Sequence, residues 1–228
     1  MNDTAKPNVF IELLITLIIP SLILMKLSGP DDLGTVNALL LALSFPLGWG
    51  VRDFIIRRKI NLLAALGLVS VLLTGGIGLL ELDTRWLAIK EAAIPGLIGL
   101  AVVISGYTRY PLVRVLLFNP SLMHVDLIQQ NLDQRGNREI FERRLKNATW
   151  MLGGTFFFSS GMNYFLATWI VTSPTGTAAF NEELGQLTLL SYPMIALPSM
   201  LIMMAVLFYL ARSIRLLAGM QLTEAIKH

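Results

Sequence analysis

The chain has 228 residues, of which 54% are hydrophobic and 14% charged, and its net charge is +3. Soluble domains carry about 25% charged residues, so the composition argues against a soluble helical core. The chain has no cysteine, which excludes disulfides and cysteine-ligated metals, and it has no base-reading motif with interleaved aromatic residues, so we expect no nucleic-acid partner.

Six apolar stretches alternate with short polar segments along the chain. A helix needs about 20 apolar residues to cross roughly 30 Å of hydrocarbon. The six stretches are Val9–Leu27, Val36–Ile56, Ile60–Leu80, Trp86–Tyr107, Thr149–Val171 and Leu187–Leu210. This pattern predicts an all-α fold: a polytopic bundle of six transmembrane helices that forms a single integral membrane domain over residues 1–228.

The first apolar stretch follows Lys6, as the apolar core of a signal peptide would. It is longer than the roughly 7–15 residues of such a core and lacks an A-x-A-like cleavage site after Met25. We therefore expect it to remain as a membrane helix.

Positive charge gathers in every second gap between the apolar stretches. Arg52, Arg57, Arg58 and Lys59 follow the second stretch, and most other basic residues follow the fourth and sixth. The alternate gaps are acidic and contain Asp31, Asp32, Glu81, Asp83, Glu182 and Glu183. Because short loops rich in Lys and Arg stay in the cytoplasm, both termini are expected there. Anionic lipid headgroups are the expected lipid partners of the basic side.

Prolines interrupt four of the predicted helices, at Pro20, Pro46, Pro95, Pro193 and Pro198. Each one removes a backbone donor and leaves a carbonyl that must be satisfied inside the protein. Packing kinks are the simpler interpretation, and a ligand site at broken helices is the alternative. The segments Phe45–Gly48 and Ile94–Leu97 also resemble each other, which suggests the hypothesis of three repeated hairpin units.

Polar residues inside the predicted helices define a candidate polar pocket of Lys90, Glu91, Asn163 and Asn37. Charge within hydrocarbon is costly, which makes Lys90 and Glu91 candidates for function. Adjacent helical residues point about 100° apart, so we expect separate partners for the two. The candidate partners are Glu81 or Asp83 for Lys90, and Arg85 for Glu91. A structural charge network, with interhelical amide hydrogen bonds, is the alternative.

Residues 111–147 form the longest polar segment and predict a cytoplasmic amphipathic connector. One helix is expected to start at Asn119-Pro120, and a second to be capped by Asn137 after Gly136. Glu139 with Arg143, and Glu142 with Lys146, have the four-residue spacing of helical ion pairs. The basic residues form a candidate headgroup or partner surface: Arg135, Arg138, Arg143, Arg144 and Lys146. A helix at the headgroup layer, a simple connector and a docking surface all fit this segment.

Catalytic signals are weak. The chain has no Walker-type phosphate loop, no HExxH motif and no clustered metal ligands. His124 is the only internal histidine and has no nearby serine or cysteine constellation. We therefore predict that the protein is not an enzyme and uses no cofactor or metal.

Short motifs in the predicted helices two to five resemble the intracellular septation protein A family of bacterial inner-membrane proteins. They include Val51–Lys59, Trp86–Lys90, Ile104–Gly106 with Pro111–Val113, and Leu145–Trp150 with Phe156, Phe157, Gly161, Asn163 and Ala167. By this resemblance, Lys90 and Asn163 fall on recurrent polar positions. The longer connector and a sixth span depart from the family, which is usually drawn with five spans, and fit a related branch.

The resemblance implies a role in envelope synthesis and division in the bacterial inner membrane. The first hypothesis is thus a noncatalytic envelope protein that acts through lipid contacts and membrane-protein partners. The alternative is a small transporter or lipid carrier with a polar pocket near Lys90, Glu91 and Asn163.

Overall fold

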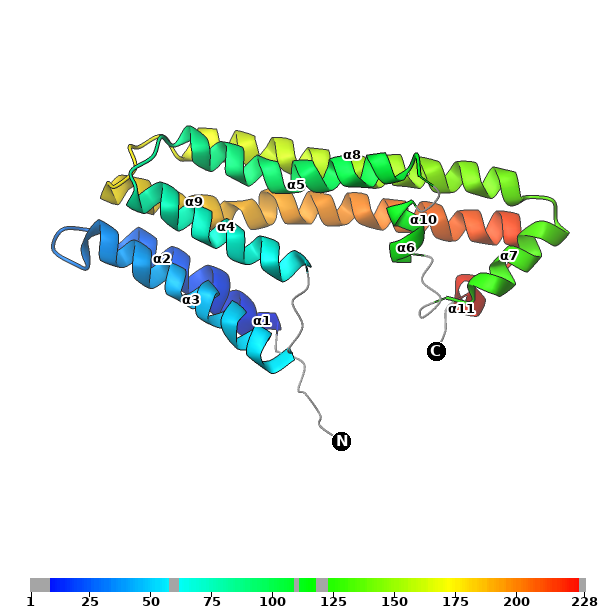
Figure 1. Cartoon of the computed structure of the whole chain (residues 1–228), viewed down its shortest axis with the longest axis horizontal. Helices are drawn as coiled ribbons and strands as arrows, with labels where there is room; N and C mark the ends of the chain where they lie inside the picture. The colour runs from blue at the N-terminus through cyan, green and yellow to red at the C-terminus, as the bar shows by residue number, and fades with distance from the viewer. Residues whose placement is uncertain (1–8, 58–61, 109–110, 118–122, 226–228) are drawn as a thin grey trace. The chain divides into compact units, whose positions relative to one another are not determined.

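The computed structural model describes residues 9–57, 62–108, 111–117 and 123–225, and within these ranges the regular elements are helices (Figure 1). The α-helices are α1 (Val9–Leu13), α2 (Ile19–Lys26), α3 (Gly34–Arg57), α4 (Leu62–Leu79), α5 (Arg85–Ser105), α6 (Leu112–Leu117), α7 (Val125–Gln134), α8 (Arg138–Ile170), α9 (Ala178–Ser191), α10 (Leu197–Ala218) and α11 (Leu222–Ala225). Two π-helical segments, η1 (Leu14–Ile18) and η2 (Tyr192–Ala196), continue the neighbouring helices. The predicted all-helical fold is confirmed.

Three helical segments of the described chain are long and apolar enough to cross a membrane. They are Gly34–Ile56, Arg85–Ser105 and the continuous Ala178–Ala218, which joins α9, η2 and α10. Helices also cover most of the other three predicted stretches, although Ile60 and the basic Arg58 and Lys59 lie outside the described residues. Three such helices indicate a membrane protein.

Two helices begin earlier than expected. The last predicted span was placed from Leu187, but its helix begins at Ala178, where Thr177 accepts a 3.1 Å hydrogen bond from the Phe180 amide. Glu182 and Glu183, predicted in a loop, are therefore helical. The predicted second connector helix and the fifth span form one continuous helix, α8, which begins after Gly136 (φ 63°). No proline interrupts the chain between Gly136 and Pro174. α8 therefore runs without a break from the connector into the fifth apolar stretch.

The prolines affect the helices unequally. η1 ends two residues before Pro20, whereas η2 contains Pro193 and ends two residues before Pro198. Pro46 and Pro95 lie inside unbroken α-helices. A π-turn accommodates one extra residue, so the wider turns η1 and η2 fit beside prolines, each of which lacks an N–H donor and leaves a carbonyl of the preceding turn without its usual partner.

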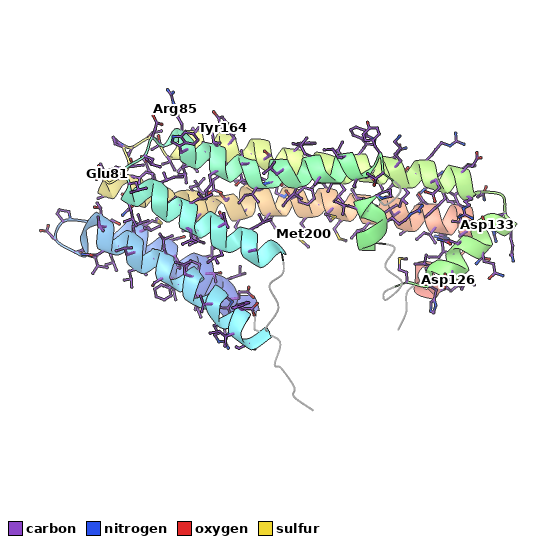
Figure 2. The ribbon with its side chains drawn as sticks, in the orientation of Figure 1. Glu81, Arg85, Asp126, Asp133, Tyr164 and Met200 are labelled. Atoms are coloured by element: carbon purple, nitrogen blue, oxygen red, sulfur yellow. The ribbon has the colours of Figure 1, made fainter. Side chains whose placement is uncertain are left out.

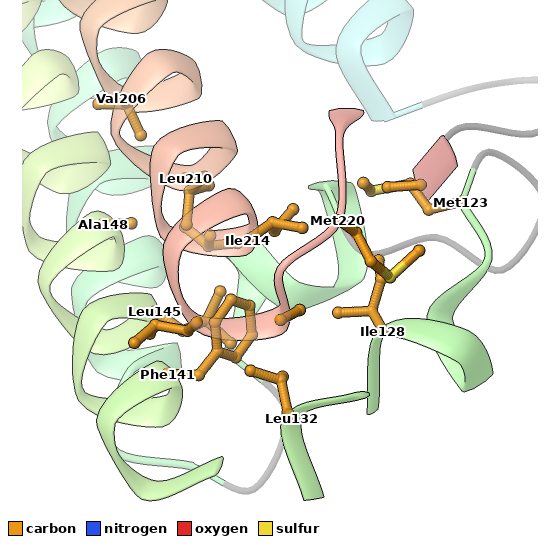
Figure 3. Close-up of a cluster of buried hydrophobic side chains, with 14 of the residues drawn as sticks. Met123, Ile128, Leu132, Phe141, Leu145, Ala148, Val206, Leu210, Ile214 and Met220 are labelled. Carbon is orange, nitrogen blue, oxygen red and sulfur yellow. The ribbon is translucent and has the colours of Figure 1, made fainter. Parts of the chain in front are cut away.

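The chain divides into two compact units, and each has its own buried core. Unit 1 comprises Met1–Ile94 and Gly161–Ile195, and unit 2 comprises Pro95–Ser160 and Ala196–His228. The core of unit 1 includes Ala38, Leu39, Leu87, Leu166 and Phe180. The core of unit 2 includes Ile128, Leu132, Phe141, Leu145 and Ile214 (Figure 3).

Small residues lie where helices cross, and large apolar residues face outward. In unit 1, Gly185 of α9 packs directly against Ser21 of α2, and in unit 2, Gly106 at the end of α5 faces Thr149 of α8. Five large side chains on α10 are 55–71% exposed: Leu197, Met200, Leu201, Met204 and Phe208. Met200 is labelled in Figure 2. Small contacts inside and large apolar groups outside are typical of helices packed in lipid.

Aromatic residues are spaced along two helices at about the thickness of a bilayer. On α5, 19 rises separate Trp86 from Ser105, two residues before Tyr107, and on α8, 19 rises separate Trp150 from Trp169, so each interval spans about 28 Å. These four rings are exposed, as aromatic residues at the membrane interfaces would be. Both lengths match the roughly 30 Å of a hydrocarbon core.

The connector packs against protein. Ile128 and Leu132, on the apolar face of α7, are 0% and 2% exposed, and they join Phe141 of α8 and Met220 in one cluster (Figure 3). Of the three interpretations of this segment, a helix with its apolar face in the headgroup layer does not fit α7, because Ile128 and Leu132 are buried against protein. The predicted start at Asn119-Pro120 lies outside the described residues. Residues of α6 and α7, with the ends of α8 and α10 and with α11, form a small subdomain.

Candidate functional site

Lys90 is the centre of a polar network inside unit 1. It lies on α5 and is 7% exposed. Its ammonium donates to Thr74 Oγ1 at 2.8 Å and to Ser70 Oγ at 3.2 Å, both on α4, and to Glu91 Oε1 at 2.6 Å. An ammonium has three N–H donors, so these partners use all of them.

The predicted partners of Lys90 and Glu91 are wrong, because the two residues pair with each other. The Lys90 ammonium reaches both the Glu91 carboxylate beside it on α5 and the two hydroxyls of α4. Asp83 has a different role: its Oδ1 accepts from the Arg85 amide at 2.8 Å, at the start of α5. Glu81 lies in the turn before α5, and Arg85 is the first residue of α5; both are labelled in Figure 2.

The network ties α4 to α5 and leaves little capacity for a ligand. The Lys90 side chain is 6% exposed and that of Glu91 is 27% exposed. The Thr74 hydroxyl also donates to the Ser70 backbone carbonyl at 3.0 Å, which holds this hydroxyl in place. A buried ammonium with all its donors used is a structural contact in this conformation.

Sequence reasoning missed Ser70 and Thr74, although a signal was present. They are the only hydroxyl residues between Leu62 and Leu79, and they stand four residues apart on an otherwise apolar helix. Residues with that spacing share one helix face. Together they could have been recognised as the partner of an intramembrane lysine.

The other two residues of the candidate pocket lie on α3 and α8. Asn37 is exposed on α3, and its amide donates a 3.0 Å hydrogen bond to the Leu33 carbonyl in its own helix. Asn163 lies half-buried on α8. The contacts of Lys90 join it to α4 and to Glu91, whereas Asn37 belongs to a separate local interaction.

The candidate basic surface divides into engaged and open residues. Arg138 pairs with Asp133 at 3.1 Å. Arg144 is half-buried and donates to Ser213 Oγ at 3.4 Å. The Arg135 guanidinium packs over Gly219, whose φ of 67° ends α10, where positive charge offsets the helix dipole.

Arg143 and Lys146 are the open members of the basic surface. Both are exposed. Neither predicted helical pair is among the ion pairs of the described residues. Glu142 pairs with Arg114 of α6 in place of Lys146. Lys146 instead lies over the Tyr107 ring, 5.1 Å from its centroid. Arg212 and Arg215, which the sequence-based surface omitted, are exposed on α10.

A small pocket lies within the connector, between residues of α6, α7 and α8, and its lining is mainly apolar. The lining residues are Arg114, Val125, Ile128, Gln129, Leu132, Arg138, Phe141, Glu142 and Leu145. Its charged rim is already internally paired through Arg114–Glu142 and Arg138–Asp133. Among the described residues, no group of three or more His, Asp or Glu could hold a metal ion.

Comparisons with known proteins give no relative: no family model matches the chain, and no curated protein or solved structure matches it. The class therefore rests on the helices themselves. Three long apolar helices, with small residues at their contacts and large apolar residues outside, indicate a helical membrane protein.

Proposed function

We propose that the protein is a noncatalytic component of the bacterial inner membrane with six spans and both termini in the cytoplasm. The spans correspond to residues 9–26, 34–57, 62–79, 85–105, 149–170 and 187–210. The alternation of basic and acidic gaps supports this orientation. The spacing of the aromatic residues at the two ends of the fourth and fifth spans matches the thickness of a bilayer and supports the placement of these spans across it.

The function is to hold protein and lipid contacts that support septation or envelope synthesis. One observation supports the noncatalytic part of the proposal. Lys90 is the strongest functional candidate among the predicted spans, and all three of its N–H donors bind within the protein, to Thr74, Ser70 and Glu91. A transporter or lipid carrier needs polar groups that are free to bind its substrate. Transport is therefore the second candidate function. The resemblance of the sequence motifs supports the envelope role.

Photocrosslinking in dividing cells tests this function. A photoreactive residue at Ile140, which is 40% exposed on the cytoplasmic part of α8, is expected to capture membrane proteins of division or wall synthesis. The matched control is Leu201, which is 71% exposed on α10 and should capture lipid. The proposal fails if Ile140 captures no such protein and depletion of the chain leaves septation and wall synthesis unchanged.

A further inference from the structure

Two helices of unit 2 carry the same pattern of exposed side chains in opposite chain directions. On α8, exposed Lys146 and Arg143 lie 4 and 7 residues before Trp150, which is 45% exposed. On α10, exposed Arg212 and Arg215 lie 4 and 7 residues after Phe208, which is 68% exposed. Residues spaced by 4 and 7 share one face of a helix.

The two helices lie side by side at this level. Arg144 of α8 contacts Ser213 of α10 at 3.4 Å, and Asn137 donates to the Leu217 carbonyl at 2.9 Å. The basic residues are adjacent in sequence to these contacts, since Arg143 precedes Arg144 and Arg212 precedes Ser213. The pair on α8 (Arg143 and Lys146) and the pair on α10 (Arg212 and Arg215) therefore lie beside the same contact between the two helices.

Aromatic contacts fix the level of the basic residues. Tyr107 packs edge-on against Trp150 with 5.8 Å between ring centroids, and the Lys146 ammonium lies over the Tyr107 ring. Rings of this kind sit where headgroups meet acyl chains. Four and seven helical rises place the Cα atoms of the basic residues about 6 and 10 Å beyond Trp150 and Phe208, at the level of lipid phosphates.

These four basic residues have no carboxylate partner among the ion pairs of the described chain. The nearby acids are engaged elsewhere, with Asp133 on Arg138 and Glu142 on Arg114. Glu139 lies one turn farther from Trp150 than Arg143 does. The exposed charge at this level is therefore positive and open.

We propose that Arg143, Lys146, Arg212 and Arg215 bind the phosphate groups of anionic phospholipids in the cytoplasmic leaflet. The proposal rests on the membrane placement above and deepens it by naming the lipid class and its ligands. Phospholipid is favoured over an acidic protein because each basic pair shares a helix face with an aromatic residue at the acyl boundary. Clustered basic residues at this position attract anionic headgroups.

Thermal unfolding of the purified full chain in detergent tests the site. Added phosphatidylglycerol is expected to raise the melting temperature, and phosphatidylcholine to leave it unchanged, because a ligand bound only by the folded state stabilises it. The shift should shrink in high salt. It should fall in both R143Q/K146Q and R212Q/R215Q, and vanish when all four substitutions are combined.

The matched control is R135Q/R138Q, which removes the same charge as either pair but from residues already engaged. It should keep the full shift. An undiminished shift in the quadruple variant would overturn the proposal, as would a shift lost equally in the control. If an acidic peptide, and no phospholipid, produced the shift, the surface would bind protein. The assay contains no cellular partner, so its failure is distinguishable from failure of photocrosslinking at Ile140.

Discussion

Replacing Lys90 with methionine is expected to lower the free energy of unfolding by about 2–3 kcal/mol. Removing one member of a buried ion pair leaves the other charge unpaired, which costs about 3–5 kcal/mol when both are fully buried. The cost is smaller here because the Glu91 side chain is 27% exposed. Methionine keeps the length of the side chain, so the loss reports on charge and hydrogen bonding. Thermal unfolding in detergent measures it.

A double variant provides the control. Lys90→Met combined with Glu91→Gln removes both charges, so stability should recover by more than half of the loss. Equal stability of Lys90→Met and the wild type would contradict the structural role of the network. In that case Lys90 would be available for another role, and carriage would become the better hypothesis.

Replacing Gly185 with alanine is expected to destabilise unit 1 by about 1–3 kcal/mol, as overpacking does. A methyl group at this position would lie 2.8 Å from the Ser21 carbonyl oxygen and 2.7 Å from Met25 Cγ. The methionine side chain can move, but the backbone carbonyl moves only if α2 and α9 separate. The substitution therefore tests the close approach of these two helices.

Gly154→Ala is the matched control, since nothing lies within 4 Å of the added methyl group on α8. Alanine is the better helix former by about 1 kcal/mol, so Gly154→Ala should equal or exceed the stability of the wild type. If Gly185→Ala proved as stable as Gly154→Ala, the α2–α9 contact would be incorrect.

The sequence was most informative about helices, because length and hydropathy are local properties. The break at Gly136 was predicted correctly, since a single glycine with positive φ needs no tertiary information. The early start of the last helix was missed. The hydropathy pattern predicts Glu182 and Glu183 in a loop, but Thr177 caps the helix, and both residues lie in its first two turns.

Tertiary contacts could not be predicted in the same way. The four-residue spacing of Glu142 and Lys146 can be read from the sequence. The position of α6, which places Arg114 beside Glu142 as its ion-pair partner, cannot. An apolar face on α7 is equally consistent with lipid and with protein. Its burial against α8 and α10 depends on where those helices end. The contacts of Lys90 likewise include two hydroxyls on a different helix, α4, which the spacing of Lys90 and Glu91 does not predict.

Site-directed labelling tests the membrane topology most directly, because the chain has no cysteine of its own. Single cysteines replace exposed Asp32, Glu182 and Gln134, and intact cells are treated with a maleimide that cannot cross the inner membrane. Asp32→Cys and Glu182→Cys should react from outside, and Gln134→Cys should react only after the membrane is opened. Reaction of all three in intact cells, or of none, would contradict a bundle whose basic connector faces the cytoplasm.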